Sequence, residues 1–249
     1  MVEMPLGIFI LIKHYEREEI KDKFKLMDIL ESTEEQRILQ RDYFRITLLE
    51  YEIEENGKAF ELALKDKDIL KCFRLLKNAF TSYSILFDNL KHLGTYCKTN
   101  QEIALLLKDL RTKLELMNHL RNKMSGHLDD EIIDKAIQWQ PTLFSQSSFD
   151  DNNVLPVCYF GLFEASLNSF MDTDGKQKYF NHEIDVCYPS DWKEFSTFIY
   201  ETYSLSLEYL SKIKGIILPK LELAQTEEEL LLKAIWAGNT DFSISKKRH

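Results

Sequence analysis

Apolar residues recur every three or four positions along most of this chain, the spacing that places them on one face of an α-helix. In the first predicted helix this face is expected to comprise Ile38, Tyr43/Phe44, Leu48/Leu49 and Ile53. The pattern predicts helices over about residues 32–55, 68–92, 100–124 and 131–139, then from about 190 to 214 and after 226.

Short polar signals mark the ends of these helices. Glycine accepts the backbone conformation that closes a helix, so the expected stops are Asn56-Gly57, Gly94 and Ser125-Gly126. Side-chain oxygens cap helix starts, which makes Asp129 or Asp130 the expected cap of the fourth helix, and Ser190 or Asp191 that of the fifth. Pro141 is expected to stop the fourth helix.

These elements predict a mainly α fold whose first part is an antiparallel helical bundle with short connections. The polar segment SQSSFDDNN at residues 145–153 is the expected boundary. We expect an N-terminal segment packed on the bundle, the bundle itself and a C-terminal helical extension, all within one compact unit, over residues 1–31, 32–144 and 145–249.

One stretch, residues 157–185, is ambiguous from its pattern. Residues 157–171 fit a buried helix, but the DTDG turn at 172–175 also fits the centre of one short β-hairpin. Both alternatives stay open at this point.

Composition narrows the classes of protein to consider. Only 8 Gly and 5 Pro occur in 249 residues, which favours long helices over a turn-rich β fold. The net charge of −9 excludes a uniformly basic nucleic-acid clamp, although not a local basic patch. The apolar run PLGIFILI near the N-terminus is too short to span a bilayer and has no basic leader, so we expect a cytoplasmic protein that does not enter the membrane.

Metal and cofactor sites find little support in the sequence. The four cysteines have no short paired spacing and are expected to be buried thiols in a reducing cytosol. DTDG lacks the acids that a calcium loop needs, and His182 has no second histidine at ligand spacing, so a plain turn and a surface histidine are expected. We therefore expect no metal and no cofactor.

The stretch NHLRNKMSGHLDDE, residues 118–131, is where reactive side chains gather. Arg121 and His127 are separated by five residues, across the predicted helix break at Ser125-Gly126, which can turn His127 back beside Arg121. Residues 108–127 carry a local excess of positive charge, made by Lys108, Arg111, Lys113, Arg121 and Lys123 against Asp109 and Glu115. A polyanion is therefore tolerated at this place in an acidic chain.

The segment RNKMSGH resembles the signature of the HEPN superfamily, in which Arg and a following polar residue precede a His by four to six positions, late in an all-α bundle. The resemblance covers roughly residues 32–140. It implies that two bundles pair about a two-fold axis and cleave RNA without metal. By the same resemblance, Arg121 and His127 are the catalytic pair, with Asn122 orienting them.

The chemistry of RNA transesterification agrees with a dimer, because it needs a base, an acid and positive charge at the phosphate. One chain offers one suitable Arg and one suitable His, whereas a homodimer offers two of each. Lys123, His119 and Arg111 are the expected contacts to the RNA, although His119 is expected to be structural or solvent-facing rather than catalytic.

Two functions are thus expected from the sequence. The first is a metal-independent endoribonuclease of toxin or defence type that acts as a homodimer on RNA. The alternative is a non-catalytic HEPN-like interaction or regulatory module, whose acidic surface meets a protein partner such as an antitoxin.

Overall fold

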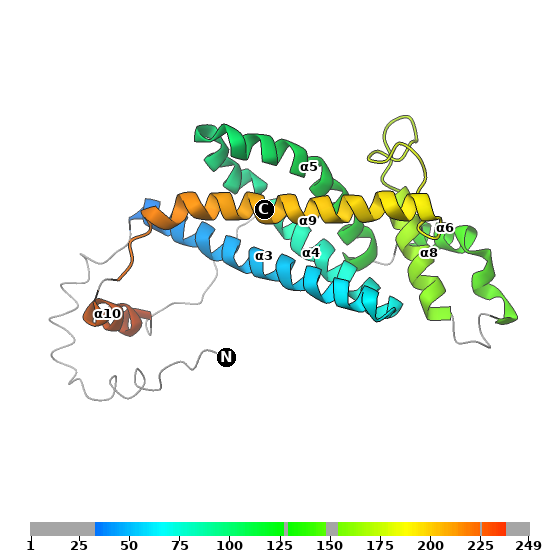
Figure 1. Ribbon diagram of the computed structural model, residues 1–249, viewed down its shortest axis with the longest axis horizontal. Helices are drawn as coiled ribbons and strands as arrows, with labels where there is room; N and C mark the ends of the chain where they lie inside the picture. Colours follow the sequence, from blue (N-terminus) through cyan, green and yellow to red (C-terminus); the bar gives the residue numbers. More distant parts are fainter. Residues whose placement is uncertain (1–32, 127–128, 148–153, 225, 238–249) are drawn as a thin grey trace. The chain divides into compact units, whose positions relative to one another are not determined.

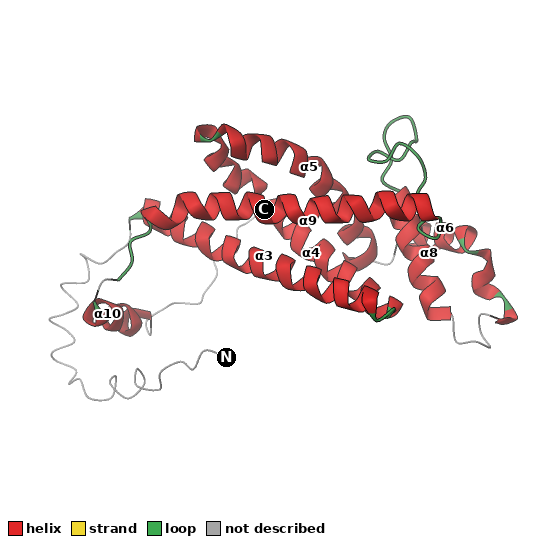
Figure 2. Ribbon diagram, in the orientation of Figure 1, coloured by secondary structure: helices red, strands yellow, loops and turns green. Residues whose placement is uncertain are grey.

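The computed structural model describes residues 33–126, 129–147, 154–224 and 226–237, and over these the chain is almost entirely helical (Figures 1 and 2). The α-helices are α3 (Glu34–Lys65), α4 (Ile69–Leu93), α5 (Gln101–Arg121), α6 (Asp130–Trp139), α8 (Val154–Asn168), α9 (Pro189–Ile217) and α10 (Glu227–Ala237). Shorter helical turns are η3 (Gly94–Thr99), η4 (Asn122–Gly126), η5 (Pro141–Phe144) and η6 (Leu218–Lys220). The predicted mainly α fold is confirmed, and these described ranges contain no β-strand.

The described chain divides into two compact units, one formed by Arg41–Pro219 and the other by the residues before and after it. In the smaller unit the Gln36 side chain joins the residues that precede Arg41 to those that follow Pro219. Its amide donates to the Lys220 carbonyl at 2.8 Å, and its carbonyl oxygen accepts from the Glu222 backbone N–H at 3.1 Å. The predicted N-terminal segment, 1–31, lies outside the described residues.

The larger unit is built on antiparallel helices. Figure 1 shows α9 beside α3, and their contacts run in opposite directions, from Glu50 with Lys214 to Gly57 with Tyr203. The same holds for α5 and α9, which are joined by Glu102–Lys212 and Lys113–Glu201. The fully buried side chains at the centre are mostly aromatic and aliphatic, including Phe80, Leu86, Leu110, Leu114, Phe163, Phe195 and Phe198.

The structure confirms most of the predicted helix ends. Asp68 accepts the Lys71 N–H at 3.0 Å at the start of α4, and Asn100 accepts the Glu102 and Ile103 N–H groups at the start of α5. Asp129 caps α6, which ends before Pro141, and α4 ends at Leu93 with Gly94 as its C-cap. Each of these signals depends only on residues within one helical turn.

The predicted stop at Asn56-Gly57 is wrong, because α3 continues through it to Lys65. The reason is tertiary packing. A Cβ atom on Gly57 would lie 2.6 Å from Cε2 of Tyr203, so the glycine serves a close approach between α3 and α9 rather than a helix end. Glycine is tolerated inside the helix because this contact offsets its poor helix propensity.

The start of α9 also differs from the prediction. Tyr188 is the N-cap, without a side-chain hydrogen bond, and Pro189 occupies the first turn. Ser190 and Asp191 lie inside that turn. The Asp191 carboxylate accepts the Asp185 N–H at 3.1 Å, so it holds the incoming connection rather than the helix end.

Two predictions about burial were too broad. On α3, Ile38, Phe44 and Leu48 are exposed, while Leu39, Ile46, Leu49 and Ile53 form the buried face. Of the four cysteines, Cys72 is buried, Cys97 is half-buried, and Cys158 and Cys187 are exposed; all four are unpaired. Both errors have one cause: whether a side chain is buried depends more on its position relative to neighbouring helices than on its apolar character.

The ambiguous stretch is a helix followed by an irregular connection. Residues 154–168 form α8, and a single bridge between Met171 and Gln177 closes the DTDG turn. Asp172 accepts the N–H groups of Asp174 and Lys176 at 2.9 Å each, and Gly175 has a positive φ of 75°, which are features of a plain turn.

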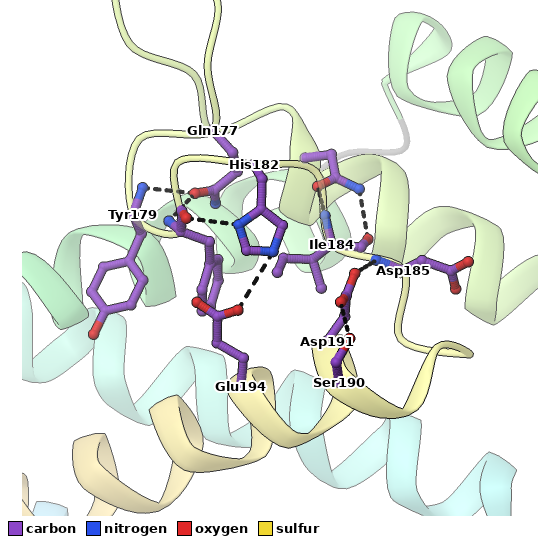
Figure 3. Close-up of polar contacts among 10 residues, drawn as sticks. Gln177, Tyr179, His182, Ile184, Asp185, Ser190, Asp191 and Glu194 are labelled. Atoms are coloured by element: carbon purple, nitrogen blue, oxygen red, sulfur yellow. Dashed lines mark hydrogen bonds and ion pairs between the residues drawn. The ribbon is translucent and has the colours of Figure 1, made fainter.

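Side-chain hydrogen bonds hold the rest of the connection, as Figure 3 shows. Gln177 accepts the backbone N–H groups of Tyr179 and Phe180. The Asn168 amide pairs with both backbone groups of Ile184, at 2.8 and 2.9 Å. These bonds, with the buried residues Gln177, Phe180, Ile184 and Val186, anchor an otherwise largely exposed connection to the unit.

None of the helices in the described ranges has the length and apolar character that crossing a lipid bilayer requires.

Candidate site at the end of α5

Arg121 is the last residue of α5 and lies on the same face of the helix as buried core residues. It follows Leu114 by seven positions and Met117 by four, and both of these are fully buried. Arg121 itself is exposed. The guanidinium therefore emerges where the packed face of α5 reaches the end of the bundle.

Asn122 holds the guanidinium. Its side-chain oxygen accepts a hydrogen bond from Nη1 of Arg121 at 3.0 Å, and both residues are exposed. Arg121 makes no ion pair with the described residues, and its side chain is exposed. The resemblance implies that Asn122 orients Arg121 and His127 together, and that role stays a prediction. The exposed guanidinium is accessible to an anion.

From Asn122 to Gly126 the backbone forms a single π-helical turn, η4. Met124 is buried and anchors this turn, whereas Ser125 is exposed. Single wide turns of this type inside or after α-helices are often found at functional sites. Here the turn sets the direction in which the chain leaves Arg121.

Lys123 does not lie free beside the arginine. Its ammonium contacts the Asp129 carboxylate at 2.8 Å, and this hydrogen bond, with a smaller contribution from the Glu131 N–H, lowers the pKa of Asp129 below its ordinary value. Asp129 also caps α6. The pair thus connects η4 to the next helix, and the predicted contact of Lys123 with RNA stays a prediction.

His127 lies outside the described residues, which stop at Gly126 and resume at Asp129. Its predicted place beside Arg121 stays a prediction.

His119 faces the protein rather than the Arg121 site. Its Nε2 lies 3.1 Å from the Ser166 carbonyl and 2.9 Å from the Ser169 hydroxyl, and its ring packs on Phe170. Burial lowers the pKa of His119, with Lys123 adding to the effect, while the bond to Ser166 opposes it. These contacts favour the structural role that the sequence suggested over one in binding.

The local excess of positive charge is smaller than the sequence indicates. Lys113 is only 8% exposed, and its ammonium contacts the Glu201 carboxylate and the Tyr179 hydroxyl at 2.6 Å each. Although burial opposes the charge, these two contacts raise the pKa of Lys113 above its ordinary value. Lys113 is therefore not available to a polyanion.

Arg111 is exposed, and its Nε lies 4.0 Å from the Glu115 carboxylate, a weak surface pair. The partners of Lys113 lie far along the chain, so a count of charges within one segment misses them. The sequence did carry one signal that Lys113 faces the core, namely its helical spacing from Leu116, Met117 and Leu120.

A second cluster, formed by Glu164, Asp185 and Cys187, places one ligand atom of each residue within 4.8 Å of the others. Glu164 is fully buried, and its two carboxylate oxygens accept hydrogen bonds from Gln140 and from the Val186 N–H. Burial raises the pKa of Glu164 and also that of Cys187. A satisfied carboxylate beside a protonated thiol is a structural arrangement and a poor cation site.

His182 is exposed, as predicted. Nδ1 lies 2.9 Å from the Phe180 carbonyl and Nε2 lies 3.4 Å from the Glu194 carboxylate, as Figure 3 shows. It thereby joins the connection to the first turns of α9. It is far in sequence from the Arg121 site, and its partners account for its position.

A scan of family models found no match to this sequence, and searches of curated proteins and of solved structures found no significant match. Functional inference therefore depends on the residues and geometry of this chain.

Proposed function

We propose that this protein is a metal-independent endoribonuclease of toxin or defence type, in which two copies bring the Arg-x5-His motifs of a HEPN-like bundle together. The observation that carries the proposal is the exposed Arg121 guanidinium on the core-facing side of α5, held by Asn122 at 3.0 Å. An arginine on this face that makes no ion pair with any described residue is suited to a phosphate.

The proposed reaction is transesterification within the RNA strand. The 2′-hydroxyl loses its proton to a neutral His127 and attacks the adjacent phosphorus, while the bond from phosphorus to the 5′-oxygen breaks. A protonated His127 from the second copy supplies the proton to the leaving oxygen, because a histidine pKa near neutrality allows both forms. Arg121 stabilises the charge of the crowded phosphate. The products are a 2′,3′-cyclic phosphate and a 5′-hydroxyl end.

The proposed setting is the reducing cytoplasm. Four unpaired thiols, two of them exposed, agree with such a compartment.

The direct test is cleavage of single-stranded and transfer RNA by the purified protein in excess EDTA. Arg121→Ala and His127→Ala are expected to lower the rate by about a hundredfold or more, since each removes a group that acts in the transition state. Asn122→Ala is expected to have a smaller effect, because it only orients the guanidinium. Cleavage that requires added metal, or that survives in both alanine variants, would reject the proposal.

Matched controls exist on α4. Arg74 and His92 are exposed residues of the same types. Arg74→Ala and His92→Ala are expected to leave cleavage unchanged, which separates loss of the motif from a general loss of charge. Relief of expression toxicity by His127→Ala, but not by His92→Ala, would support the toxin assignment in cells.

A second function, the non-catalytic module, is favoured by one surface of the larger unit. Phe44, Leu48 and Tyr51 follow one another at helical spacing on α3 and are 66%, 49% and 65% exposed. An exposed apolar stripe of this kind marks a protein-binding surface. If no RNA is cleaved and toxicity is relieved by Phe44→Asp or Tyr51→Asp, but not by Arg121→Ala, the module is the better description.

A further inference from the structure

A cavity of about 330 Å³ lies between α3, α4 and α9 of the larger unit. Aromatic side chains form much of its wall, with Phe60 from α3, Tyr83 from α4, and Trp192, Phe195, Tyr200 and Tyr203 from α9. None of these residues belongs to the Arg121 site. The volume lies in the range of pockets that hold small organic ligands.

Gly57 allows one wall of this cavity to form. Because a Cβ at this position would lie 2.6 Å from Cε2 of Tyr203, only glycine lets the tyrosine ring lie against the α3 backbone. The ring thereby becomes part of the lining. A flat aromatic surface of this type favours a flat, apolar occupant.

Tyr83 supplies an unusual polar group. Its side chain lines the cavity and is only 4% exposed, yet its hydroxyl makes no hydrogen bond within the part of the chain that the structure describes. Burial, with a smaller effect of Tyr203, raises the pKa of Tyr83, so it stays protonated and acts as a donor. A tyrosine hydroxyl that lines a cavity and has no partner among the described residues can donate to an acceptor atom on a ligand.

Charged residues that line the cavity restrict the charge of the ligand. Lys58 lines the cavity, but its ammonium contacts the carboxylates of Glu54 and Glu55 at 2.9 Å each. Glu61 also lines the cavity, is exposed, and forms no ion pair with the described residues. The cation is therefore neutralised and an acid remains, which disfavours an anionic ligand.

We propose that this cavity is a binding site for a small, uncharged aromatic molecule that carries a hydrogen-bond acceptor for the Tyr83 hydroxyl. The aromatic walls contact the ring system, the Tyr83 donor orients it, and the acidic mouth rejects anions. This site is independent of RNA cleavage, and its test does not require a nuclease.

Three probes of nearly equal shape separate these contributions: 2-acetylnaphthalene, 2-ethylnaphthalene and 2-naphthoate. In equilibrium dialysis against the full chain, the ketone is expected to bind most tightly, the hydrocarbon less tightly and the carboxylate most weakly. Tyr83→Phe is expected to weaken the ketone about three- to tenfold, the value of one hydrogen bond, and to change the hydrocarbon by less than about twofold.

Two variants fill the cavity from different helices. Ala79→Phe on α4 and Ser196→Phe on α9 are each expected to abolish binding of the ketone, whereas Asn78→Phe, at an exposed α4 position that does not line the cavity, is not. Circular dichroism and thermal unfolding establish that each variant is folded. If one of the two filling variants does not fold, the other still tests the proposal. No binding of the ketone by the wild type would overturn the proposal. So would binding that survives both filling variants, equal loss of ketone and hydrocarbon in Tyr83→Phe, or preference for the carboxylate.

Discussion

His119 and Arg121 lie two residues apart on α5, about 200° around the helix, and their surroundings differ accordingly. A carbonyl oxygen only accepts, so in the hydrogen bond between His119 and Ser166 the ring Nε2 is the donor. The Ser169 hydroxyl donates to the same carbonyl at 2.8 Å. The Arg121 guanidinium instead reaches solvent at the helix end. The sequence already separated the two, and the structure shows His119 packed within the fold and Arg121 exposed.

The buried state of His119 predicts a pH dependence of stability. Its pKa is lowered in the folded protein, first by burial, so the unfolded chain binds the proton more readily. The free energy of unfolding is therefore expected to be highest above about pH 6.5, the ordinary histidine pKa, and to fall as the pH drops below it. Urea unfolding at pH 7.5, 6.5 and 5.5 measures this, and His119→Gln, which keeps a donor for Ser166, is expected to flatten the decline.

The control for this measurement is His92→Gln, because His92 is exposed at the end of α4. It is expected to leave the pH dependence of the wild type unchanged. A decline of the same slope in His119→Gln as in the wild type would show that other groups cause it.

At the scale of elements, the sequence predicted those helix ends that are determined by residues close to them in the chain. Four predicted ends were found: the helix starts near Asp68 and Asn100, the cap Asp129 and the stop before Pro141. Each depends on hydrogen bonds or backbone geometry within one turn. The end of α3 was missed because Asn56-Gly57 has the local chemistry of a helix stop, yet its conformation is decided by Tyr203 on α9. A residue almost 150 positions away cannot be identified from the local pattern.

The α3–α9 contact gives a prediction of its own. Gly57→Ala is expected to destabilise the protein by about 1 kcal/mol, because overpacking against Tyr203 exceeds the gain in helix propensity. In a Tyr203→Ala background the same change is expected to stabilise it by about 1 kcal/mol, since only the propensity gain remains. Chemical denaturation of the four proteins yields the coupling between the two sites. Additive effects would show that Gly57 is present for another reason.

At the scale of the whole molecule, the sequence located one exposed pair of the candidate site and missed the cavity. Arg121 and Asn122 are adjacent, so their pairing follows from a short motif. The cavity needs side chains from α3, α4 and α9, and Lys113 needs Tyr179 and Glu201, all brought together only by the fold. Local spacing carries no information about such long-range neighbours.

The proposed chemistry makes the assembly of two chains testable. If cleavage needs one histidine as base and another as acid, a dimer with a single His127 lacks one of them. Mixing wild type with an equal amount of His127→Ala, under conditions that allow subunits to exchange, is then expected to lower activity per wild-type chain to about half, because half of the wild-type chains are in mixed dimers. Chains that act alone would keep full activity at every mixing ratio.

His92→Ala in place of His127→Ala is the matched control and is expected to add its own activity in proportion to its amount. Sedimentation of the wild type is expected to show a dimer at the concentrations used, and a strict monomer would contradict the mechanism irrespective of the mixing result.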